Sequence, residues 1–90
     1  METILSMVKL DLLIPLSETA YDDRLLQYIA SAQAELKRRG IVLTESVDDQ
    51  NLVAVYAAWM WRNRHKGDGE PRMIQWMVHN RLISQKGAVE

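Results

Sequence analysis

Two pairs of neighbouring aspartates are the residues whose type is best suited to bind a metal ion or to exchange protons. They are Asp22-Asp23 and Asp48-Asp49. Thr19 stands three residues before Asp22, and Ser46 stands three residues before Asp49. This spacing is typical of a helix start, where the hydroxyl accepts a backbone N–H and the carboxylates complement the helix dipole. We therefore interpret both pairs as helix-capping residues.

The other polar residues form no catalytic or metal-binding pattern. His65 and His79 fall on different predicted helices, without HxxxH or HExxH spacing. Ser31 and Ser84 lack a G-x-S-x-G context, and a sequence without cysteine has no thiol nucleophile or thiolate ligand. The Gly67-x-Gly69 segment lacks the remaining residues of a phosphate-binding loop. We predict no catalytic residue, no cofactor, no cofactor-binding residue and no metal ligand, and we expect that the protein is not an enzyme.

Positive charge is concentrated in two clusters, residues 37–39 and residues 62–66. Each cluster lies at the end of a predicted helix, where cations complement the dipole, and contact with a partner or with phosphates is the alternative. The net charge is −1, whereas a domain that binds DNA through its overall charge is usually basic. A helix-turn-helix is also a weak match, because the last predicted helix carries few residues able to read bases.

The tryptophans indicate a protein–protein contact. Trp59 and Trp61 are about 200° apart on a helix of 3.6 residues per turn, so one small core cannot easily bury both. We expect one of them in the core and the other at a contact with another protein; the alternative is that both lie partly exposed around the core. The residues that we predict for subunit contact are Trp61, Arg62, Arg64 and Trp76.

One apolar stretch, from Leu52 to Trp61, must position these residues. It is too short to cross a membrane, and its alanines and methionine favour a helix. A helix that is apolar nearly all round is normally covered on several sides. A chain of 90 residues has few elements to provide that cover, so we expect another subunit to bury part of the surface.

Helical periodicity predicts four helices, at about residues 3–13, 22–39, 48–66 and 71–85. Pro15, Gly40 and the Gly67 to Gly69 segment separate them, and Pro71 begins the last one. No segment shows the alternation of a strand, and no basic region precedes the apolar N-terminus as in a signal peptide. With 48% apolar and 26% charged residues, the sequence predicts one all-α domain over residues 1–90, a small four-helix domain with one central apolar helix.

The order of these segments resembles the head–tail connector family of tailed bacteriophages, also described as head-completion or DNA-packaging adaptor proteins. The resemblance covers about residues 4–84 and departs from the family pattern in the apolar stretch before Asp22 and in the short link at 41–47. Three segments carry it: the acidic helix start Asp22-Asp23-x-Leu25-Leu26-x-x-Ile29-x-x-Ala32, the helix from Val53 to Trp59 that ends in Arg62-Asn63-Arg64, and Pro71-x-x-Ile74-x-x-Met77 with Arg81-Leu82.

The resemblance implies a structural protein of a phage or prophage that forms a ring of about a dozen copies by heterologous contacts. The ring would lie beneath the portal, extend the DNA channel and dock the tail. The implied partners are other copies of the chain, the portal and tail-completion proteins, with DNA only as passing cargo and no membrane. The implied locations are the virion connector and, during assembly, the cytoplasm of the bacterial host. Other possible functions are a small helical DNA-binding regulator, a protein like a terminase small subunit, and a helical protein-binding module.

Overall fold

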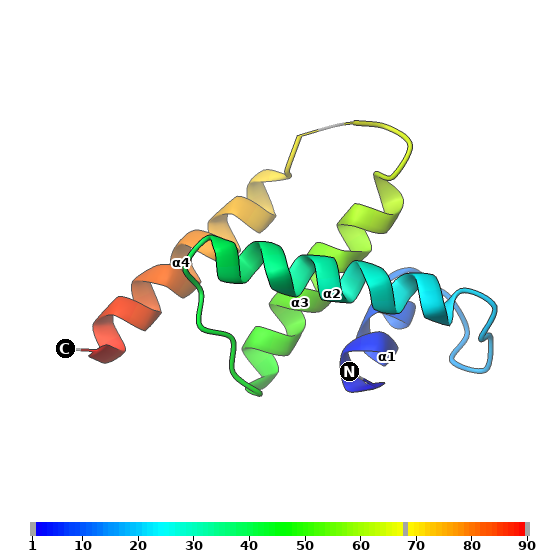
Figure 1. The fold of residues 1–90 in the computed structure, drawn as a ribbon, viewed down its shortest axis with the longest axis horizontal. Helices are drawn as coiled ribbons and strands as arrows, with labels where there is room; N and C mark the ends of the chain where they lie inside the picture. The colour runs from blue at the N-terminus through cyan, green and yellow to red at the C-terminus, as the bar shows by residue number, and fades with distance from the viewer. Residues whose placement is uncertain (1, 68, 90) are drawn as a thin grey trace.

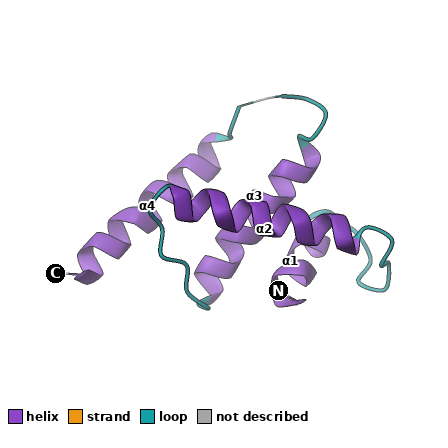
Figure 2. Cartoon of the chain, in the orientation of Figure 1, coloured by secondary structure: helices purple, strands orange, loops and turns teal. Residues whose placement is uncertain are grey.

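Four α-helices make up the computed structural model, which describes residues 2–67 and 69–89 (Figure 1). They are α1 (Glu2–Asp11), α2 (Asp22–Arg38), α3 (Val47–Arg62) and α4 (Arg72–Val89). Within these residues there is no strand, and Figure 2 shows only helices and their connecting loops. The predicted all-α fold with four helices is confirmed.

The central position belongs to α3, which packs against α1, α2 and α4. In Figure 1, α2 crosses in front of α3, and α4 lies on the opposite side of the molecule from α1. One face of α2 packs against the core. Its buried residues recur every three or four positions, which places them on one side of the helix: Leu25, Ile29, Ala32 and Leu36. The apolar residues of α3 are buried over most of its circumference: Leu52, Val53, Ala54, Tyr56, Ala57 and Ala58. The alanines among them allow neighbouring helices to approach closely.

The end of α1 places a leucine in a backbone conformation that favours glycine. Leu13 has a φ of +61°, and its neighbour Ile14 donates its N–H to the carbonyl of Lys9 at 2.8 Å, which closes the helix end. Gly40 occupies the corresponding position after α2, with a φ of +99°. A left-handed conformation costs a leucine roughly 1–2 kcal/mol. Leu13 is 89% exposed, so burial in the subunit does not offset that cost.

Three predicted helix ends differ from the structure. The first helix ends at Asp11, because the backbone turns at Leu13 before Pro15 is reached. The central helix ends at Arg62 and not at Lys66, since the apolar stretch that packs on its neighbours stops at Trp61 and further helix would bury little. The last helix passes through Gly87 to Val89, because one glycine in a helix costs only about 1 kcal/mol.

The two predicted N-caps have different outcomes. The Ser46 Oγ accepts a hydrogen bond from the backbone N–H of Asp49 at 3.2 Å, which confirms the cap of α3. The prediction for Thr19 is wrong, because Tyr21 occupies the N-cap position of α2 and no side chain caps that helix. Only the backbone carbonyl of Thr19 takes part, as the acceptor from the N–H of Asp22.

The close packing of α3 can be tested by enlarging a buried alanine. We expect Ala57→Leu to lower the free energy of unfolding by about 1–3 kcal/mol, because Ala57 is fully buried and added methyl groups would push the helices apart. Denaturant unfolding followed by circular dichroism measures the change. The control is Ala34→Leu on the exposed side of α2, for which we expect a change within about 0.5 kcal/mol. Equal effects of the two substitutions would contradict the packing described here.

Candidate functional site

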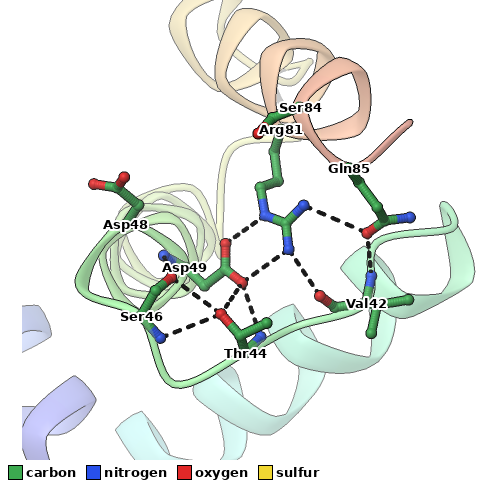
Figure 3. Close-up of a pocket in the computed structure, with 8 residues that line it drawn as sticks. All are labelled: Val42, Thr44, Ser46, Asp48, Asp49, Arg81, Ser84 and Gln85. Atoms are coloured by element: carbon green, nitrogen blue, oxygen red, sulfur yellow. Dashed lines mark hydrogen bonds and ion pairs between the residues drawn. The ribbon is translucent and has the colours of Figure 1, made fainter. Parts of the chain in front are cut away.

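A buried ion pair joins α3 to α4 (Figure 3). The carboxylate of Asp49 is 3% exposed and accepts hydrogen bonds from Arg81, at 2.5 Å from Nε and 3.1 Å from Nη2. Thr44 donates both its backbone N–H and its hydroxyl to the same carboxylate, each at 2.8 Å. The guanidinium also donates to the carbonyl of Val42 at 2.8 Å. The pair therefore fixes α4 to the start of α3 and to the link that follows α2.

The role of this cluster is to hold the helices together. The hydrogen bond from Arg81 lowers the pKa of Asp49; burial opposes the shift, and the bonds from Thr44 add to it. A carboxylate held ionised in this way is a poor proton acceptor at neutral pH. Gln85 completes the attachment of α4 by donating to the carbonyl of Gly40 at 2.9 Å and accepting from the N–H of Val42 at 2.7 Å.

Capping is therefore an incomplete explanation of the two aspartate pairs. Asp49 lies in the first turn of α3 as predicted, but its carboxylate binds Arg81 on a helix 32 residues later. Asp22 pairs with Lys9 of α1 at 2.7 Å, and the Lys9 side chain is only 4% exposed. Neither partner was found from the sequence, because pairs of this kind depend on the packing of distant helices.

The basic cluster at residues 37–39 also has internal partners. Arg39 forms a two-point contact with Glu70, at 2.8 and 2.9 Å, and donates to Glu35 at 3.0 Å. It also donates to the Tyr56 hydroxyl at 3.2 Å. These bonds raise the pKa of Arg39, with the hydrogen bond to Glu70 as the largest cause. Arg39 thus ties the end of α2 to the residues before α4, a role beyond the dipole effect expected for it.

Three of the four residues predicted for subunit contact gather at one corner of the molecule. Trp61 lies edge-on to Tyr21 and Tyr28, with 5.7 Å between ring centroids in both cases, and the Arg64 guanidinium lies 4.0 Å above the Trp61 ring. Arg62 pairs with Asp11 at 3.0 Å. We name this surface the basic corner; the residues that line its hollow are Leu12, Ile14, Tyr21, Trp61, Arg62, Arg64 and Lys66.

The fourth residue, Trp76, lies elsewhere, on the outward side of α4. It is 65% exposed, and Met73 and Ile83 on the same side are 61% and 55% exposed. These three residues form what we name the α4 stripe, opposite the buried Ile74 and Val78. Trp76 also lines a groove of about 440 Å³ between α3 and α4, which we name the α3–α4 groove. Its lining residues are Asp48, Asn51, Leu52, Trp76, Met77, Asn80, Arg81 and Ser84.

The expectation that either Trp59 or Trp61 is buried in the core is wrong. Both are partly buried and pack against the core from outside, Trp59 edge-on to Tyr56 at 5.6 Å and Trp61 against the tyrosines of the basic corner. The alternative arrangement, with both tryptophans around a small core, is the one observed. Trp76 is the tryptophan that faces solvent.

Among residues 2–67 and 69–89, no group of three or more His, Cys, Asp or Glu side chains could hold a metal ion. In the same part of the chain, none of the helices has the length and apolar character needed to span a membrane.

Comparison with known proteins gives one match. A family model described as "phage connector protein" matches residues 4–62, which is about two thirds of the chain and runs from α1 to the end of α3. No curated protein and no solved structure matches the chain. Asp49 lies inside the matched segment, while Arg81 and Trp76 lie beyond it on α4.

The Asp49–Arg81 pair leads to a prediction for stability. We expect Asp49→Asn to lower the free energy of unfolding by about 3 kcal/mol at pH 7, because it leaves a largely buried guanidinium without its counter-ion. Thermal or urea unfolding measures the change. The control is Asp48→Asn, since the neighbouring Asp48 is exposed and points away from the cluster in Figure 3. A loss for Asp48→Asn as large as that for Asp49→Asn would contradict the assignment.

The same pair predicts a pH dependence. The pKa of Asp49 is lowered on folding, so its contribution is complete above the unfolded value of about 3.9 and is lost as the pH falls through the folded value. The stability difference between the wild type and Asp49→Asn should therefore shrink when the pH is lowered below about 4. Urea unfolding at a series of pH values measures it, and a difference that grows on acidification would contradict the direction of the shift.

Proposed function

The chain belongs to the phage connector protein family, and from this premise we propose that it is a ring-forming subunit of a phage or prophage head–tail connector. Members of this family are structural proteins associated with the virion. The proposed ring lies beneath the portal, extends the DNA channel and provides the surface on which the tail docks. Its partners are other copies of the chain, the portal and tail-completion proteins, and it assembles in the cytoplasm of the bacterial host.

The observation that supports this proposal is the presence of two separate apolar surfaces on one small subunit. One is the α4 stripe. The other, which we name the turn patch, surrounds the link between α1 and α2 and consists of Leu10, Leu13, Leu16 and Tyr21, which are 63%, 89%, 54% and 47% exposed. In Figure 1, the α1–α2 link lies at one end of the long axis, and α4 runs from near the middle of the molecule to the other end.

Two different surfaces on separate elements suit a heterologous contact. If one surface binds the other on the next copy, each subunit uses both, and the series closes into a ring when the rotation between copies allows it. A twofold dimer needs only one self-complementary surface and would leave the second exposed. Exposed apolar surfaces of this kind mark protein–protein contacts in soluble proteins.

The charge distribution supports DNA as passing cargo. The net charge is −1, and a basic side chain in or directly after each helix pairs with a carboxylate of the same subunit: Lys9, Arg39, Arg62 and Arg81 have partners in Asp22, Glu70, Asp11 and Asp49. Guanidinium and ammonium groups paired in this way attract phosphates less strongly. A channel through which DNA moves should not hold the phosphates tightly.

Solution mass tests this proposal. We expect light scattering over a range of concentrations to give a closed oligomer whose mass does not change when duplex DNA is added at low salt, and electron microscopy to show rings. A small DNA-binding regulator, the competing function, would bind DNA with an affinity that falls steeply as salt increases. A monomer that binds DNA in this way would contradict the connector proposal.

A further inference from the structure

We propose that the contact between neighbouring copies inserts Leu13 of one subunit into the α3–α4 groove of the next. This inference rests on the proposed ring and identifies the two surfaces that would form it. The inserted side chain belongs to the turn patch. The groove is lined by the apolar side chains of Leu52, Trp76 and Met77 together with polar residues.

The conformation and exposure of Leu13 argue that its side chain has a role outside the subunit. A glycine or asparagine would adopt a φ of +61° with less strain, and a polar residue would suit a position that is 89% exposed. Leucine is thus unfavourable in the isolated subunit on both counts. Burial of the side chain in another molecule would offset both penalties. Leu10 and Leu16 flank it with further exposed apolar surface.

The α3–α4 groove has the size and chemistry to receive a leucine. Its volume of about 440 Å³ exceeds that of one aliphatic side chain, so part of the flanking turn can enter as well. Trp76 at its edge is 65% exposed in the subunit, and a large aromatic side chain in a pocket is typical of the residues that dominate binding energy. The groove is also held open by a fixed frame, because the Asp49–Arg81 pair and Gln85 attach α4 to the rest of the subunit.

Charges at the two ends of α3 favour the same pairing. Glu45 just before α3 and Asp48 in its first turn are both exposed, and neither is in an ion pair with any residue of 2–67 or 69–89. Asp48 lines the groove. The other end of α3 carries Arg64 and Lys66, which lie beside the turn patch in the basic corner. A head-to-tail contact brings these opposite charges together, which favours the correct orientation and faster association.

A copy of the chain is therefore the occupant that fits the groove. The inserted turn and the groove are separate surfaces of one polypeptide, with Asp48 at the groove and Arg64 and Lys66 beside the turn. Met73 and Ile83 do not line the groove and stay available on the α4 stripe for other partners. An isologous contact between two turn patches would bring like charges of two basic corners together.

The first test uses variants that separate folding from assembly. We expect Leu13→Gly to keep or raise the melting temperature, because it relieves backbone strain, and to weaken self-association by about tenfold or more. Trp76→Ala should weaken self-association to a similar degree at the other surface, with unchanged helicity. Val47→Ala removes a comparably exposed aliphatic side chain outside the turn patch, the α4 stripe and the groove, and it serves as the control, with self-association within about threefold of wild type. Trp61 is unsuitable for this test, because it packs against Tyr21, Tyr28 and the core.

The second test mixes the two variants. Leu13→Gly protein has an intact groove and Trp76→Ala protein has an intact turn, so a mixture should form pairs of one copy each and nothing larger. Sedimentation velocity measures the species. If the wild type forms rings and both variants form rings of equal stability, this contact is overturned and the proposed function stands. A wild-type protein that stays monomeric up to about 1 mM would overturn the ring together with the contact.

Discussion

The burial of α3 is the constraint on which the rest of the structure depends. This helix is apolar around most of its surface, and the chain has three other helices with which to cover it. Helices α1 and α2 pack on it closely because Ala54, Ala57 and Ala58 leave room for their backbones. Helix α4 covers a further side with only part of its own surface. Polar clamps, made by Asp49 with Arg81 and by Arg39 with Glu70, hold the less extensive packing of α4 in place.

The same shortage of covering surface explains the exposed apolar residues. A small chain buries a smaller fraction of its surface than a large one. The turn patch and the α4 stripe are surfaces left uncovered, one around the α1–α2 link and the other on the outward side of α4. The family match ends at Arg62, so one of these surfaces lies within the matched segment and the other lies on the helix that follows it. A contact between the turn patch of one copy and the groove beside Trp76 of the next would cover part of both surfaces.

The sequence predicted the features that depend on local periodicity and failed on those that depend on distant packing. The stripe from Leu25 to Leu36 and the cap at Ser46 were found because both follow from residues within one or two helical turns. The partner of Asp49 was missed, since nothing within a few residues indicates a bond to Arg81. The strained conformation of Leu13 was also missed, because a leucine gives no signal for a positive φ.

The four residues predicted for subunit contact lie on two different surfaces, for a related reason. Trp61, Arg62 and Arg64 were selected as neighbours in sequence, and the structure places them together at the basic corner. Each of them has a partner within the subunit, namely Tyr21, Asp11 and the Trp61 ring respectively. Whether a tryptophan is covered depends on which loop folds over it, which periodicity does not reveal. Of the four residues, Trp76 is the one with the most exposed apolar surface.

The central claim, that a neighbouring copy covers the groove beside Trp76, is tested most directly by fluorine NMR of protein labelled with 5-fluorotryptophan. The three tryptophans give three signals, and Trp76→Phe assigns the one of interest. The account predicts that the Trp76 signal shifts and loses its sensitivity to solvent as the protein assembles, while the Trp59 signal, from a residue already packed on the core, changes little. An assembled protein in which Trp76 remains as exposed to solvent as in the monomer would contradict it.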